Sequence, residues 1–281
     1  MNKVQIVMPE LFLPQPLARD ACAGLQLPAL EKLLARAEAM PLSTDTLEAW
    51  LCEAFGVDDL ALAALTLQAD GVAPGSAYCL RADPVHIRLQ REQMVLQAGV
   101  VPSEEEAAQL CASLNAHFFG SGMHFIAPHP QRWYLQLAEA PALHTHPLSR
   151  VAGRDVRAFL PQGGDALHWH AVFNEIQMLF FTHAVNQARE ERGEPAINSV
   201  WLWGGGYVTS VLPQPYARLS ADSELALALA AAAGSSGSTP ASWAGRGTRR
   251  ARCRRSGKLQ FPDSLSWCPI VRQTPRPCGR R

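Results

Sequence analysis

The chain has 281 residues, of which 48% are hydrophobic and 18% are charged, and its formal net charge at neutral pH is zero. This composition is typical of a globular protein, and the length allows one large domain or two small ones. No stretch approaches the roughly 20 apolar residues of a membrane-spanning helix, and the apolar run at the N-terminus is too short for a signal peptide. We therefore expect a cytoplasmic protein without a membrane partner.

The zero net charge hides a separation of charge along the chain. Residues 235–281 contain eleven Lys and Arg and one acidic residue, which leaves fourteen basic against twenty-four acidic residues in 1–234. An acidic body repels polyphosphate chains, so nucleic-acid binding is expected only through this basic tail. The composition of the tail predicts low order. Its abrupt start after an alanine run is typical of a GC-rich gene read out of frame.

The seven cysteines divide into four in the body and three in the tail. Cys22, Cys52, Cys79 and Cys111 lie far apart in apolar settings, and no two of them form a Cys-x-x-Cys pair. This pattern indicates buried free thiols of a cytosolic protein.

Hydrophobic periodicity predicts a strand and three helices in residues 1–70. The apolar run at 4–8 is typical of a first strand, which Pro9 ends. The apolar stripe at 28–40, the capped segment at 45–55 and the Ala/Leu-rich segment at 59–68 favour helices.

Residues 71–140 show a different pattern, with two hairpins around one helix. Turn residues open the segment, and Ser103 with Glu106 forms a capping box at the start of the helix. The predicted elements are strands at 78–89, 93–97, 123–127 and 132–137 and a helix from 103 to 117. We expect a small inserted α+β subdomain.

The segment 141–234 contains the longest helical pattern of the chain, at 168–192. A strand at 199–203 then leads into a run of three glycines, and a short helix is expected at 222–233. This order favours an α/β fold with a parallel-sheet core. We expect 1–70 and 141–234 to form that core, incomplete at its C-terminal end, with 71–140 inserted and 235–281 as the tail.

The glycine run at Gly204, Gly205 and Gly206 is the sharpest local feature. Glycines after a strand allow backbone N–H groups to approach an anion such as phosphate. The residues that follow match neither a nucleotide-binding P-loop nor a dinucleotide fingerprint. A tight structural turn is the alternative interpretation.

Charged residues on the first long strand form a second candidate site. Arg81 and Asp83 share one face of an extended chain, whereas His86 lies on the other. They could form an anion-binding strand in which Asp83 holds Arg81 in place, and a solvated edge is the alternative. On the long helix, Asn186, Arg189 and Glu190 are spaced so that they share one face. They could form part of a binding site, and a surface ion-pair cluster is the alternative.

Histidine pairs at His144 and His146 and at His168 and His170 raise the question of a metal site. No set of Asp or Glu with ligand spacing accompanies them, and an i, i+2 pair on a helix does not share a face. We therefore expect no metal ion.

Several motifs resemble the archaeal-type, cofactor-independent phosphoglycerate mutases. They are an Asn-Glu at 174–175, the sequence HAVN at 183–186, an Arg-rich helix end, PAIN at 195–198 and a strand into the three glycines. A closer resemblance is to bacterial regulatory proteins of the RpfE type. It is carried by LRADPVH at 80–86, RWYL at 132–135, NEIQM at 174–178 and NSVWLWGGG at 198–206.

The resemblance implies an alkaline-phosphatase-like fold with the catalytic set lost. The mutases use two metal ions and a serine nucleophile and have Asp-Gly after strand one, where this chain has Pro9-Glu10. Ser43, near Asp45, is the candidate nucleophile, and the C-terminal metal ligands of the family would lie beyond Gly234.

The resemblance therefore favours a non-catalytic regulatory protein, a pseudoenzyme without a cofactor, that binds a phosphorylated small acid. The implied ligand-binding residues are Arg81, Asp83, His86, Asn186, Arg189, Arg192, Gly204, Gly205 and Gly206. The alternative is an active mutase or phosphoesterase that depends on manganese or magnesium.

Overall fold

The computed structural model describes residues 4–9, 11, 22, 24–40, 44–57 and 61–239. Glu10, Ser43 and the tail from 240 onward lie outside the described residues, so the expectations for them are not addressed by the fold. Within the described part of the chain, no helix is both long and apolar enough to cross a membrane.

The N-terminal part contains three of the predicted helices but not the predicted strand. The helices are α2 (Pro28–Arg36), α3 (Leu47–Phe55) and α4 (Ala63–Ala69). The expected strand at 4–8 is irregular backbone, although Val7 is buried. A strand needs a neighbour for its backbone groups, and no described strand pairs with this segment.

Five strands form the main sheet, and every pairing in it is antiparallel. They are β1 (Tyr78–Gln90), β2 (Gln93–Gln97), β3 (His124–His129), β4 (Arg132–Leu137) and β5 (Ser199–Gly206). The order is β2-β1-β4-β3, with β5 also paired to β1. The expected parallel-sheet core is therefore not formed by this sheet. Two-residue turns join β1 to β2 and β3 to β4, and such short connections require antiparallel neighbours.

Parallel pairing occurs, among the described residues, in a second sheet of two short strands. These are β6 (Arg218–Ser220) and β7 (Ser236–Ser238). β7 lies at the start of the segment that the sequence assigns to the tail, so ordered structure continues past Gly234.

β5 connects the expected inserted subdomain to the rest of the chain. Its residues pair with β1 from Cys79 to Val85, and β4 pairs with β1 over 78–81. Since a strand has two edges, β4 and β5 lie on opposite sides of β1. A strand from 141–234 therefore completes the sheet of 71–140.

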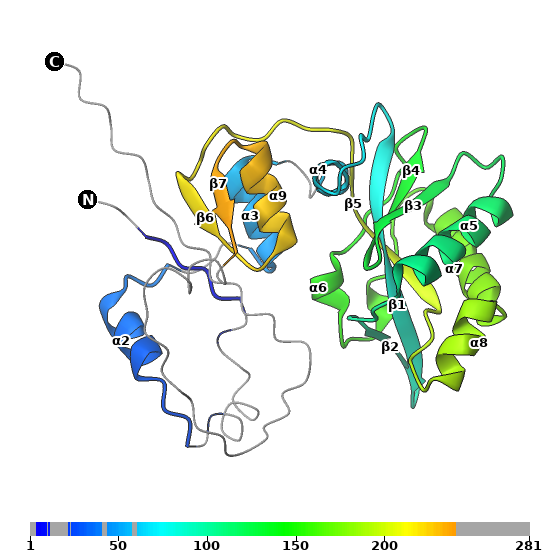
Figure 1. The fold of residues 1–281 in the computed structure, drawn as a ribbon, viewed down its shortest axis with the longest axis horizontal. Coiled ribbons are helices and arrows are strands. Elements are labelled where there is room, and N and C mark those ends of the chain that lie inside the picture. The colour runs from blue at the N-terminus through cyan, green and yellow to red at the C-terminus, as the bar shows by residue number, and fades with distance from the viewer. Residues whose placement is uncertain are drawn as a thin grey trace.

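Helices cover the main sheet on both faces. On one face lie α5 (Glu104–His117), α7 (Ala166–Phe181) and α8 (Ala184–Glu191), and they bury a cluster that includes Leu80 and Ala82 of β1 (Figure 1). α4 contacts β1 and β5, and Cys79 packs with its residues. Alternation along β1 thus directs Leu80 and Ala82 to one face and Cys79, Arg81 and Asp83 to the other.

The predicted long helix at 168–192 is two helices. α7 ends at Phe181, and His183 takes an extended conformation (φ −72°, ψ 136°) in which its ring accepts a hydrogen bond from the Val185 N–H as the N-cap of α8. The periodicity alone did not reveal this break, because both helices keep apolar residues on their inner faces. The predicted capping box is confirmed, since Ser103 and Glu106 satisfy each other's backbone N–H groups.

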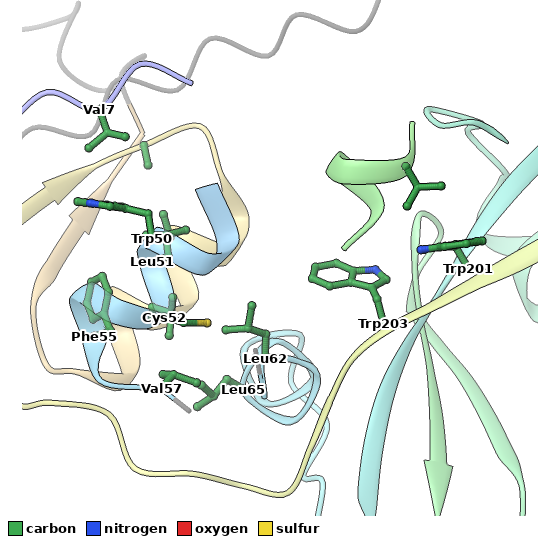
Figure 2. Close-up of a cluster of buried hydrophobic side chains, with 14 of the residues drawn as sticks. Val7, Trp50, Leu51, Cys52, Phe55, Val57, Leu62, Leu65, Trp201 and Trp203 are labelled. Atoms are coloured by element: carbon green, nitrogen blue, oxygen red, sulfur yellow. The ribbon is translucent and has the colours of Figure 1, made fainter. Parts of the chain in front are cut away.

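The remaining helices are the short α6 (Leu148–Val151), a 3-10 turn (Val156–Ala158) and α9 (Glu224–Ala232), the last capped by Ser223. The 3-10 turn contacts β2 of the main sheet, whereas α9 packs on β6 and β7 of the second sheet (Figure 1). α9 contacts α3 and α4 in a core shared with Val7. Figure 2 shows Leu62 and Leu65, at α4, between the α3 side chains and Trp203 of β5.

Three of the four body cysteines are buried free thiols, as predicted, but Cys22 is exposed. Cys22 lies ahead of α2, a helix without buried residues. Burial raises the pKa of the Cys111 thiol to about 12, which keeps that thiol protonated and unreactive.

Candidate functional site

Arg81 and Asp83 form a buried ion pair on β1. The Arg81 and Asp83 residues are 8% and 3% exposed. Nε and Nη2 of Arg81 donate to Oδ1 of Asp83 at 3.0 and 2.6 Å. The expectation that Asp83 holds Arg81 in place agrees with this geometry, because residues two apart on a strand project to the same side. The pair is buried beneath α4, so the alternative of a solvated edge does not apply.

Two aromatic side chains enclose the guanidinium of Arg81. Its Cζ lies 5.2 Å from the ring centre of Tyr134 on β4 and 5.3 Å from that of Trp203 on β5. The indole N–H of Trp203 donates to Oδ2 of Asp83 at 2.7 Å. The sequence did not single out Tyr134 or Trp203 for this role, although both stand in the quoted motifs. Strand register decides it, since Arg81 is paired with both residues across the sheet.

A second ion pair adjoins the first. Arg132 donates from Nε and Nη2 to the Asp70 carboxylate at 2.7 to 3.1 Å and also contacts Glu224 of α9. The Tyr134 hydroxyl donates to Oδ2 of Asp70 at 2.6 Å. A continuous polar chain therefore runs from Arg81 past Tyr134 to Asp70 and Arg132. We call Arg81, Asp83, Tyr134, Trp203, Asp70 and Arg132 the Arg81 cluster.

The electrostatics of the Arg81 cluster follow from burial and charge. Burial acts to raise the pKa of Asp70, but the Arg132 and Tyr134 hydrogen bonds bring it below its ordinary value. For Asp83, burial is the largest influence and raises the pKa, against the opposing effects of Arg81 and Trp203. Burial also raises the pKa of Tyr134, so its hydroxyl remains a donor.

The three glycines belong to β5 and extend the strand next to the Arg81 cluster, where a loop was expected. Gly204 has a φ of 67°, which favours glycine, and its carbonyl accepts from the Leu62 N–H at 3.1 Å. A side chain on Gly205 would meet the Tyr78 ring, and one on Gly206 would meet Ala61. Gly204 and Gly206 thus allow the residues at the start of α4 to approach the strand closely. The glycines lie in a strand and not in the tight turn of the alternative interpretation.

The residues predicted on the long helix lie elsewhere, at α8. The Asn186 amide donates to the Phe180 and Ile197 carbonyls and accepts from the Ile197 N–H, all at 2.8 Å. It fastens the start of α8 to the segment before β5. Asn186 is 2% exposed and lacks contact with Arg81.

Arg189 and Arg192 share one carboxylate, that of Glu106 on α5. Each donates to Glu106 at 2.6 Å, and Arg192 also contacts Glu194. Burial acts to raise the pKa of Glu106, but the Ser103 backbone N–H and the two guanidinium groups bring it below its ordinary value. Arg189 is 2% exposed, so the expected surface cluster is partly a buried one. Glu190 is exposed.

A shallow surface hollow of about 620 Å³ lies between α5 and α8. Arg192 lines it together with Glu105, Glu106 and Glu194. Three carboxylates against one guanidinium make this hollow unfavourable for an anion.

The predicted histidines take separate structural roles. His86 makes a 2.8 Å hydrogen bond through Nδ1 to the Ala196 carbonyl, and His170 makes one of 2.9 Å to the Pro161 carbonyl. His144 pairs in a β-bridge, away from the Arg81 cluster. Across the described ranges, no three His, Cys, Asp or Glu side chains gather as ligands for a metal ion.

His183 makes a further polar contact with α5. Its Nε2 lies 2.8 Å from Oγ of Ser113, while Nδ1 accepts from the Val185 N–H. Because Nδ1 is an acceptor, Nε2 carries the hydrogen of the neutral ring and donates it to Ser113. Burial lowers the pKa of His183. The ring therefore cannot act as a base toward Ser113, and the contact is structural.

No protein-family model matches the chain. The chain is 32% identical, over 57 residues, to the 2,3-bisphosphoglycerate-independent phosphoglycerate mutase of Methanosarcina mazei, a match that covers 20% of this chain and 14% of that enzyme. The cofactor-independent phosphoglycerate mutase of Thermoplasma acidophilum aligns with 14% identity and a TM-score of 0.41, over 70% of this chain and 56% of the other.

The PH0037 protein of Pyrococcus horikoshii aligns with 14% identity and a TM-score of 0.35, over 64% of this chain and 42% of the other. The chain thus spans about half the length of these solved structures. It has a distant similarity to cofactor-independent phosphoglycerate mutases, at low identity and partial coverage.

Proposed function

We propose that this chain is a non-catalytic regulatory protein of the RpfE type on a phosphoglycerate-mutase-like scaffold, and that the Arg81 cluster binds a phosphorylated small acid. The supporting observation is the arrangement of Arg81. Asp83 holds Nε and Nη2, two rings hold the guanidinium plane, and Nη1 has no hydrogen bond to a described residue.

A guanidinium held in this way suits phosphate recognition. Arginine binds phosphate through directed N–H groups, and its plane stacks on aromatic rings. Because Asp83 and the rings fix the Arg81 side chain, little further entropy is lost when an anion binds. Arg132 lies close enough to Arg81 for the two charges to interact, and its own charge is paired with Asp70 and Glu224.

The α8 residues do not support a second anion contact. Arg189 and Arg192 are both paired with Glu106, and Glu194 also contacts them. Among the described residues, no aromatic ring stacks on either guanidinium group as two rings do on Arg81, and three carboxylates line the hollow beside Arg192. We therefore place the ligand at the Arg81 cluster and assign Asn186 and Arg189 a structural role.

Calorimetric titration with 3-phosphoglycerate tests this proposal, with inorganic phosphate and glycerate as separate ligands. The test variant is Arg81→Met combined with Asp83→Asn, which removes both charges together. The control is Arg157→Met with Asp155→Asn, an exposed pair with the same spacing. We expect binding to be lost in the test variant and retained in the control. Binding that survives in the test variant would refute the Arg81 cluster as the site.

A mutase assay with added manganese tests the regulatory part of the proposal. We expect no interconversion of 3- and 2-phosphoglycerate. Turnover that Ser43→Ala abolishes would instead establish the alternative, an active metal-dependent mutase. The titration tests whether the Arg81 cluster binds the ligand, and the mutase assay tests whether the chain catalyses a reaction. Either result can be obtained without the other.

A further inference from the structure

The outer face of α7 carries large apolar side chains that the fold leaves uncovered. Leu167, Met178 and Phe181 are 85%, 75% and 83% exposed. The inner face of the same helix already supplies the core, through residues such as Trp169 and Ile176. Contiguous exposed apolar residues on a helix are typical of an interaction surface.

The exposed residues follow a coiled-coil spacing. Leu167, Ala171, Asn174, Met178 and Phe181 are all exposed and succeed one another at intervals of 4, 3, 4 and 3 residues. This 4-3 spacing places them in one stripe along the helix, as in the a and d positions of a heptad repeat. We call these five residues the α7 stripe.

The outer members of the α7 stripe are symmetric about its single polar member. Leu167 and Phe181 lie seven residues before and after Asn174, whereas Ala171 and Met178 lie three before and four after it, one residue short of symmetry. Two copies of the helix placed antiparallel, with Asn174 facing itself, therefore bring Leu167 opposite Phe181 and place Ala171 within one residue, about 1.5 Å along the axis, of Met178. A carboxamide is both donor and acceptor, so two of them can pair across a two-fold axis.

We propose that α7 packs antiparallel against α7 of a second copy of this chain, with the two-fold axis at Asn174. A small residue meets a long flexible one in the inner layers, and a leucine meets an aromatic ring in the outer layers. The polar pair at the centre selects this register over shifted ones, as buried asparagines do in coiled coils.

The area of the α7 stripe agrees with a weak dimer. An aromatic side chain buries about 150–250 Å² and a leucine or methionine about 100 Å². At the observed exposures, three side chains from each copy give roughly 560–740 Å² of apolar surface. Since about 60% of an interface is apolar, the whole contact buries roughly 900–1,200 Å². This lies at the low end for specific interfaces and favours a dissociation constant in the micromolar range.

Sedimentation velocity of the full chain, from about 5 to about 500 µM, tests the proposal. We expect a monomer–dimer equilibrium within this range. Leu167→Arg and Phe181→Glu should each raise the dissociation constant at least tenfold. Leu89→Glu is the matched control, because Leu89 is 75% exposed but lies on β1 near the hairpin tip. It should leave the equilibrium unchanged, and circular dichroism checks that every variant is folded.

Combining Leu167→Arg with Phe181→Glu in one chain tests the antiparallel register. Each new arginine then faces a new glutamate of the second copy, so we expect dimerisation to return. A chain that stays monomeric up to the highest concentration, a dimer that both single variants leave intact, or a double variant that does not recover would each overturn the proposal. None of these results depends on ligand binding at the Arg81 cluster.

Discussion

The buried ion pair on β1 gives the sharpest prediction about stability. Arg81→Met removes the cation but leaves the Asp83 carboxylate in place, 3% exposed. The indole N–H of Trp203 still donates to that carboxylate. The carboxylate, however, loses its counter-charge inside the protein, where water cannot replace it.

The size of the effect follows from this geometry. Breaking a buried pair by removing one partner costs about 3–5 kcal/mol, and the lost contacts with two rings cost about 0.5–1 kcal/mol each. These contributions sum to about 4–7 kcal/mol. Because Trp203 still donates to Asp83, we expect Arg81→Met to lower the free energy of unfolding by about 4 kcal/mol, the lower end of that range. Adding Asp83→Asn removes the stranded charge and keeps an acceptor for Trp203. The double variant should therefore lose only about 1–2 kcal/mol, which is about 2–3 kcal/mol less than the single variant loses.

Urea unfolding followed by circular dichroism at pH 7 measures these differences. With a slope of about 2.5 kcal/mol per molar urea, the single variant should unfold at a midpoint roughly 1.6 M lower than the parent chain. The exposed pair Asp155 and Arg157 is the control, since water solvates both groups and the corresponding single and double variants should unfold at nearly the same urea midpoint. Equal losses in the single and double variants would show that Asp83 does not depend on Arg81, and would refute the reasoning.

Three further outcomes follow from other contacts. The pKa of Glu106 is lowered in the folded chain, so the ionised carboxylate stabilises the fold above about pH 4.3, and this stabilisation is lost as the pH falls through the folded pKa. Glu106→Gln keeps the capping hydrogen bonds. It should therefore flatten the pH dependence of the free energy of unfolding, measured in urea, below about pH 5. Gly206→Ala should lower the free energy of unfolding, measured by thermal unfolding, by about 3 kcal/mol, and Gly205→Ala by about 1 kcal/mol. The new methyl group at 206 meets the backbone and Cβ of Ala61, whereas the one at 205 meets the end of the Tyr78 side chain. Asn186→Asp should lower the free energy of unfolding, measured in urea, by about 3 kcal/mol. The Phe180 and Ile197 carbonyls are then buried without their hydrogen-bond donor.

Local patterns predicted most elements of the chain correctly. The hairpin β1–β2, the strands β3 and β4 and the capped helix α5 appear where turn residues, alternation and the capping box placed them. These signals depend on residues close in sequence, so they can be recognised without knowledge of the tertiary structure. The break at His183 was missed, because a histidine N-cap inside an unbroken apolar pattern gives no periodic signal.

The candidate site could be predicted only in part. Sequence alone determined that Arg81 and Asp83 share a side of one strand, since this depends on backbone geometry. The strand at 199–203 was also predicted, but it continues through the three glycines that were expected to form a loop. Tertiary structure decided that β5 lies beside β1, which brings Trp203 and the glycines to Arg81 and leaves Arg189 at Glu106. It also decided the antiparallel main sheet. Strand pairing joins residues more than a hundred positions apart, and nothing in the local sequence specifies which edge a strand will meet.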